Sequence, residues 1–177
     1  FTTAGGAPAA HVAWWNGNSW WPIGAGLNNA VQALAYSGTN LYAGGWFDGG
    51  VARWNGSAWS VLGTGVGGSV EAIVVSGSNV YVGGYFETAG GQPANAVARW
   101  DGSQWHPLGE GLGSLYQHAT VWGIALSGDL VYVGGSFTNA GGIAANGIAK
   151  WDGTNWSAWG DGGGVGHLQG RRYPGDH

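Results

Sequence analysis

Five histidines and nine acidic residues are the side chains of this 177-residue chain that could carry acid–base or metal chemistry. There is no cysteine, which excludes a disulfide, a Cys-ligated metal and a Cys nucleophile. Imidazole and carboxylate together suit zinc or a similar divalent ion, and a bound ion could activate water to hydrolyse an ester or phosphoester. We expect His11, His118 and His167 as metal ligands in that case, and Glu71 and Asp48 as the acidic candidates for catalysis.

Ordinary loop variation is the alternative explanation of these residues. The chain has no H-x-H or H-E-x-x-H spacing, and metal motifs depend on such spacing. It also lacks the G-x-S-x-G motif of a serine nucleophile. His106 could be a ligand or a proton carrier, but its place in a repeated strand favours a surface residue of an outer strand.

Thirteen tryptophans form the second group of notable side chains. Eight of them occupy fixed places in a segment that occurs four times, at 12–24, 51–63, 97–109 and 148–160. The third copy reads VARWDGSQWHPLG, and each copy has a Trp, an Asn-Gly or Asp-Gly, and a second Trp five residues after the first. Residues present in every copy are expected to pack the fold. Trp14, Trp21, Trp46 and Trp122 lie outside these places and are therefore the candidate ligand-binding or subunit contacts, for instance by stacking on a sugar.

A second repeated segment lies between the first ones, at 31–47, 70–86 and 121–137. Each copy has a Ser-Gly between two apolar runs and ends in Gly-Gly, which predicts two short strands joined by a turn; the alternation in NVYVGG and LVYVGG, with β-branched and aromatic residues, is typical of a strand. No window has a helical period of useful length. The repeat unit is therefore expected to have four strands, typified by AIVVSG, NVYVGGYF, AVARW and SQWHPLG. The Asp-Gly or Asn-Gly supplies the tight turn between the last two.

The spacing of the units is that of propeller blades: Trp54 and Trp100 are 46 residues apart, and Trp100 and Trp151 are 51 apart. The Gly-Gly that closes the second strand and the Trp in the fourth resemble the Kelch repeat and propellers of the galactose-oxidase-like type. The phrases FTTAGG, FETAGG and FTNAGG are similar to repeats of bacterial surface proteins and of fungal cell-polarity landmark proteins. The resemblance implies a β-propeller. It does not imply the copper chemistry of galactose oxidase, which needs a cysteine.

The predicted fold class is all-β, a partial propeller of about three and a half blades and so a fragment of a ring. We expect a half blade at 1–26, blades at 27–65, 66–111 and 112–162, a propeller region of 1–160, and a tail at 163–177. The tail has no counterpart in the repeats, and both a capping role and an origin outside the repeat protein stay open. Closed rings have about 4–8 blades, so exposed edges should make the chain a homo-oligomer, with a dimer favoured.

Charge and composition narrow the function classes. The net charge is −4 and the five basic residues are scattered, which argues against nucleic acid as a partner. No apolar run reaches the length of a membrane span. Low charge with abundant Gly and Trp weakly favours an extracellular or cell-surface location. The expected function is a self-assembling binding module. The alternatives are a metal-dependent hydrolase with zinc or another divalent ion, and a lectin-like protein with a glycan or small-molecule ligand.

Overall fold

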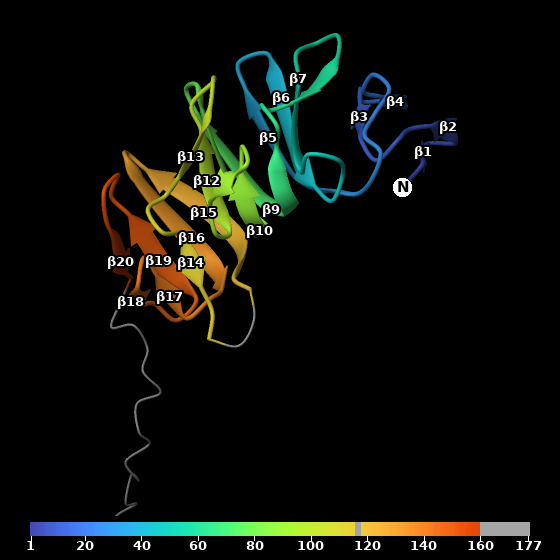
Figure 1. Ribbon diagram of the computed structural model, residues 1–177. Helices are drawn as coiled ribbons and strands as arrows, with labels where there is room; N and C mark the ends of the chain where they lie inside the picture. Colours follow the sequence, from blue (N-terminus) through green and yellow to red (C-terminus); the bar gives the residue numbers. More distant parts are fainter. Residues whose placement is uncertain (116–117, 160–177) are drawn as a thin grey trace, which may run out of the picture.

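The computed structural model describes residues 1–115 and 118–159, and within them every regular element is a β-strand (Figure 1). This confirms the all-β prediction. The described part contains no apolar helix of membrane-spanning length.

Three four-stranded antiparallel sheets form the body of the molecule, each with its strands side by side in chain order. The first sheet consists of β5 (Val31–Ser37), β6 (Asn40–Gly45), β7 (Val51–Trp54) and β8 (Trp59–Val61). The second consists of β9 (Val66–Ser76), β10 (Asn79–Ala89), β12 (Val97–Trp100) and β13 (Trp105–Pro107), with the short β11 (Gln92–Pro93) added to β10. The third consists of β15 (Thr120–Ser127), β16 (Leu130–Ser136), β19 (Ile148–Trp151) and β20 (Trp156–Ala158).

The chain begins with smaller pieces. β1 (Thr3–Ala4) pairs with β2 (Ala7–Pro8), and β3 (Ala13–Trp15) pairs with β4 (Trp20–Pro22). We call β3–β4 the N-terminal hairpin. Its strands correspond to the last two strands of each full sheet. β3 pairs with no other strand in the described residues, whereas the equivalent β7, β12 and β19 have partners on both sides.

The Asn or Asp of the repeated segment shapes the turn before the second Trp. In all four copies its Oδ1 accepts hydrogen bonds from the backbone N–H groups two and three residues later. The following Gly has φ between +97° and +104°, a conformation that glycine adopts without steric cost. Both side chains offer the same acceptor oxygen, which explains why Asn16, Asn55, Asp101 and Asp152 interchange.

The FxxAGG segments, which the four-strand repeat unit leaves as connections before its third strand, contain short hairpins. Gly90 and Gly91 have φ of +62° and +77°, the two positive values that a type I′ turn requires. Thr88 and Ala89 therefore pair with the residues of β11 across that turn. The same Gly-Gly turn joins β1 to β2 and joins β17 (Asn139–Ala140) to β18 (Ile143–Ala144). β14 (Leu112–Gly113) then pairs with β17.

The hydrophobic cores lie between successive sheets. β9 packs on β5 and β6, and β15 packs on β9 and β10. The first glycine of the Gly-Gly in β6 and in β10 makes room for the next sheet: the space that a Cβ on Gly44 would fill is taken by Val70, and Val121 does the same at Gly83. Both valines are fully buried. Glycine is required here because any side chain would push the two sheets apart.

A hydrogen bond from the second Trp ties each sheet to the preceding unit. The indole Nε1 atoms of Trp59, Trp105 and Trp156 donate to carbonyl oxygens in the segment that follows the previous last strand. The three acceptors and distances are Ile23 at 2.9 Å, Leu62 at 2.9 Å and Leu108 at 2.7 Å. These three bonds are equivalent by repeat position, and they hold the sheets in the same relative placement.

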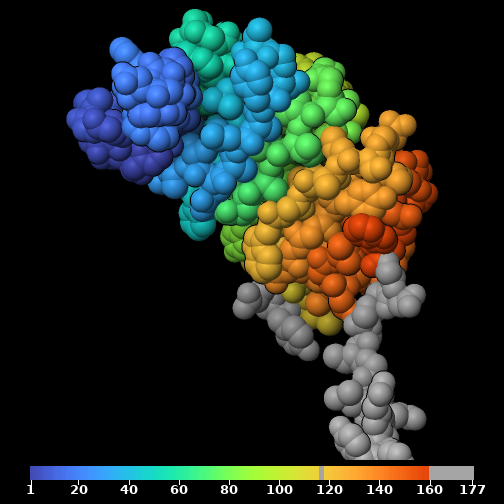
Figure 2. Space-filling model, turned by 180° about the vertical axis from the view of Figure 1, so that it is seen from behind, coloured from blue at the N-terminus to red at the C-terminus, as the bar shows by residue number. Residues whose placement is uncertain are grey.

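The units follow one another across the molecule in an open row. The hairpins of the N-terminus lie at one end and the third sheet lies at the other (Figures 1 and 2). The described residues therefore expose two different terminal faces.

Candidate functional site

Bulges in the first strands of the three sheets mark the positions of one candidate group. β5, β9 and β15 each have a bulge, which leaves Gln32, Glu71 and Trp122 respectively out of the pairing register. Oε1 of Glu71 accepts hydrogen bonds from Nε1 of Trp46 and from Oγ of Ser69, both at 3.0 Å. Trp46 and Trp122 are 59% and 65% exposed. Of the expected residues, the structure thus brings Glu71 and Trp46 into contact.

His118 forms a separate small cluster at the second sheet. Its Nδ1 lies 2.7 Å from Oε1 of Glu87, and its ring meets the ring of Tyr85 edge-on at 5.6 Å. Both members of the ion pair are exposed, so solvent screens their attraction and the pair adds little stability. Glu87 and His118 border an open pocket of about 230 Å³, together with Phe86 and Asn95.

His11 has an unusual backbone, with φ of +63°. The equivalent Ala96 has the same φ, and the equivalent Gly50 and Gly147 are also positive. The repeat geometry therefore imposes this conformation, and it does not mark a function of the imidazole. His11 Nδ1 is buried without a hydrogen-bond partner in the described residues.

The structure does not bring the expected metal ligands His11 and His118 into one site. His11 borders a pocket of about 400 Å³ at the N-terminal hairpin, and His118 borders a different one. His167 lies outside the described residues, as do Tyr116 and Gln117 beside His118. Within residues 1–115 and 118–159 no three His, Asp or Glu side chains are placed to hold an ion. The hydrolase hypothesis therefore has no assembled ligand set in the described part of a single chain.

Asp48, an acidic candidate for catalysis, makes hydrogen bonds that hold two loop segments together. Its Oδ2 accepts a hydrogen bond from Nδ2 of Asn28 at 2.6 Å, and its backbone N–H donates to Oδ1 of the same residue at 3.0 Å. These two bonds fasten the turn after β6 to the segment before β5.

Trp14 and Trp21 face each other across the N-terminal hairpin, in places where the other repeats have Arg or Lys and Ser or His. Both are about half exposed. Trp14 borders an open pocket of about 640 Å³ with Tyr36, Leu41 and Trp54 of the first sheet. The four candidate tryptophans thus divide into a pair on the hairpin, Trp46 beside Glu71, and Trp122 at the bulge of β15.

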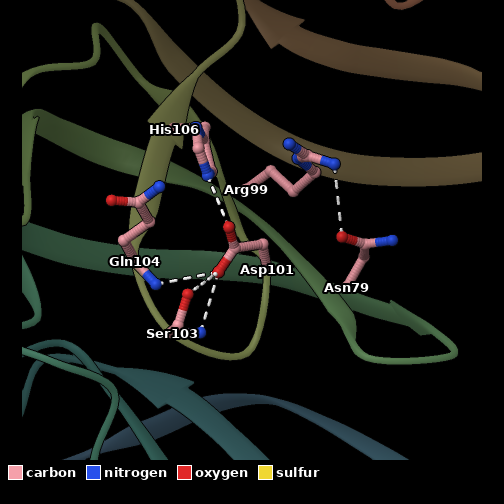
Figure 3. A network of polar contacts seen from close by, with 6 residues as sticks. All are labelled: Asn79, Arg99, Asp101, Ser103, Gln104 and His106. Carbon is pink, nitrogen blue, oxygen red and sulfur yellow. Dashed lines mark hydrogen bonds and ion pairs between the residues drawn. The ribbon is translucent and has the colours of Figure 1, made fainter.

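A polar network at the second sheet was not expected from the sequence (Figure 3). His106 Nε2 lies 2.7 Å from Oδ2 of Asp101, so His106 is a half-buried partner of the turn rather than a free surface residue. Hydrogen bonds from the backbone N–H of Gln104, then from His106 and Ser103, hold the pKa of Asp101 well below its usual range. Beside it, Nη1 of Arg99 donates to Oδ1 of Asn79 at 3.3 Å. Asp101 and His106 stand on opposite sides of the Asp-Gly hairpin turn in the sequence, and this spacing could have indicated their contact.

No protein-family model and no curated protein matches the chain. Two similar solved structures are the computationally designed proteins Ika8 and Ika4. Ika8 is 18% identical with a TM-score of 0.51, and the match covers 76% of this chain but 40% of Ika8. Ika4 is 21% identical with a TM-score of 0.52, and the match covers 81% of both chains. At this identity the likeness concerns the fold alone.

Proposed function

We propose that the chain is a propeller-type interaction module of Kelch-like repeats that associates with itself. The observation that carries this proposal is the difference between the terminal hairpin and the full sheets. Trp15 and Trp20 of the hairpin are 50% and 45% exposed, whereas their equivalents in the three full sheets are partly buried or, for Trp156, only 4% exposed. Aromatic side chains that are covered in the full sheets are left open at the end of the row, and such patches mark association sites.

Two further features support an interaction module over an enzyme. The residues common to all copies are accounted for by turns, inter-sheet hydrogen bonds and packing. The acidic candidates Glu71 and Asp48 are engaged by neighbouring side chains, and neither shares a described contact with a histidine.

Sedimentation velocity over a wide concentration range tests the proposal. We expect a dimer or larger species that dissociates on dilution. A monomer at every concentration would contradict it, whatever the ligand-binding properties of the chain.

Carbohydrate binding is a second candidate function, favoured by Trp46 and Trp122. Both are exposed; Trp46 lies against Glu71 at the bulge of β9, and Trp122 stands at the bulge of β15 in the next sheet. Glu71 offers a carboxylate oxygen that a sugar hydroxyl could use. Aromatic rings stack on sugar faces while such acceptors fix the orientation. A glycan screen with wild type, Trp46→Ala and Trp122→Ala tests this. Binding that both variants retain in full would exclude this site.

A further inference from the structure

The contact between one unit and the next is built the same way throughout the row. The second Trp of each later unit donates to a carbonyl of the unit before it. In the two inner contacts, a valine of the later sheet also fills the space above a glycine of the earlier one. The contact thus has two unlike faces: a donating face, with the Trp pair, and an accepting face, with the carbonyl and the glycine.

The N-terminal hairpin presents a donating face on which no other sheet of the described residues packs. Trp15 and Trp20 form the same tilted pair, with ring centres 5.5 Å apart, as the pairs of the three full sheets. Trp20 also packs on Gly5 as Trp105 packs on Gly90, so its indole already has the placement of the bonded tryptophans. Its Nε1, however, has no acceptor among the described residues.

The third sheet presents an accepting face that no other described residue covers. Trp159 stands where Leu62 and Leu108 stand in the earlier units, and those two residues supply the accepting carbonyls. Its indole is 54% exposed and lies 4.8 Å from the ring of Tyr132. The space above Gly134 has no side chain in it, unlike the space above Gly44 or Gly83.

We infer that these two faces bind each other between copies, head to tail. The outer face of the N-terminal hairpin of one copy packs on the third sheet of another, and Nε1 of Trp20 donates to the carbonyl of the partner's Trp159. The occupant is a second copy because the chain itself carries, at its opposite end, the donor that the third sheet lacks and the acceptor that Trp20 lacks. The contact uses the indole-to-carbonyl bond of the row; the hairpin has no first strand, so it supplies no valine above Gly134. This inference rests on the proposed self-association and names its surface.

Substitution of Trp20 tests the donating face. Trp20→Phe keeps a smaller aromatic ring and removes the indole N–H, so we expect the dissociation constant of the assembly to rise at least roughly tenfold, the effect of one hydrogen bond to a carbonyl. Trp21→Phe is the matched control, because Trp21 lies on the opposite face of the hairpin and donates to Ser19 Oγ. We expect it to change the constant less than about twofold.

Cross-linking tests the orientation, and the absence of cysteine makes single thiols unambiguous. Asn18→Cys marks the hairpin turn and Ser157→Cys marks the third sheet. At the contact of the second and third sheets, the counterpart of Asn18 is Thr154 and the counterpart of Ser157 is His106. His106 lines a pocket there, and Thr154 directly follows Gly153, which lines the same pocket. With a short bismaleimide, an equal mixture of the two variants should give Asn18→Cys to Ser157→Cys links, and either variant alone should give none.

The outcomes separate the two proposals. Absence of any association would overturn the self-association itself. Association with links between two copies of Asn18→Cys, or with a dissociation constant that Trp20→Phe leaves unchanged, would keep self-association and overturn the head-to-tail contact.

Discussion

Replacing Trp156 with phenylalanine should measure what one inter-sheet hydrogen bond contributes. The indole of Trp156 is 4% exposed and donates over 2.7 Å to the carbonyl of Leu108, a residue that is 2% exposed. Phenylalanine removes this donor, but the Leu108 carbonyl keeps its hydrogen bond from the backbone N–H of Gly111 at 3.1 Å. The loss is therefore that of one hydrogen bond, about 0.5–1.5 kcal/mol. The smaller ring adds a packing loss of about 1 kcal/mol. We expect the free energy of unfolding to fall by about 1.5–2.5 kcal/mol in total.

Trp151→Phe is the matched control, because the two rings stack on each other at 5.4 Å. The indole N–H of Trp151 makes no hydrogen bond within the described residues, so only the packing loss of about 1 kcal/mol should appear. Urea denaturation at one fixed protein concentration, followed by circular dichroism, compares the two variants. Equal losses in both variants, or a loss below about 0.5 kcal/mol for Trp156→Phe, would refute the assigned role of the bond.

Three further predictions concern turns, pH and the N-terminal hairpin. Gly65 and Gly142 have nearly equal φ of +78° and +79°, but a Cβ on Gly65 would collide with a backbone carbonyl while one on Gly142 meets nothing within 4 Å. Gly142→Ala should therefore cost about 1 kcal/mol and Gly65→Ala more than about 3 in thermal or urea unfolding, and equal costs would contradict the close approach at Gly65. The pKa of Asp101 is lowered from 3.8 in the folded chain, so the stability it contributes is present above that value and is lost as pH falls below it. Asp101→Asn keeps the turn that asparagine makes in two other copies, so its stability deficit relative to wild type should shrink below about pH 4, and a deficit that grows there would contradict the sign. A copy of residues 66–85 placed directly before Phe1 would supply the two strands that the sheet of β3 lacks. This extension should raise the temperature midpoint of unfolding, and an extension with the same residues in scrambled order should not. An equal effect of both would show that the edge of β3 does not pair with the added strands.

Local features of this fold can be predicted from the sequence, because they depend on neighbouring residues. The alternation in NVYVGG and the Asp-Gly turn are of this kind, and they predict the strands of the four-stranded units. The Gly-Gly of FETAGG carries an equally local signal for a type I′ hairpin, but its place between long strands masks the turn pattern and favours the prediction of a loop.

Contacts over a long sequence distance cannot be predicted in this way. The sequence predicts that Trp156 packs, but its bond to Leu108 depends on how two sheets dock. The residue type and position of Glu71 make it a catalytic candidate. In the structure, a bulge in β9 places its carboxylate in a hydrogen bond with the indole of Trp46. Trp159 gives no repeat signal because the other copies have an aliphatic residue at its position, although it stacks on Tyr132 at one end of the row.

The indole-to-carbonyl bonds have a consequence for how such chains can change in length. Each bond joins a unit only to the one before it, and each unit carries both the donor and the acceptor. A tandem duplication or deletion of one period, 46 residues from Trp54 to Trp100, would therefore leave every remaining bond with a partner of the same kind. Recombination between repeats can therefore add or remove a unit without requiring a new kind of contact. The number of units can change in evolution independently of the sequence within each unit.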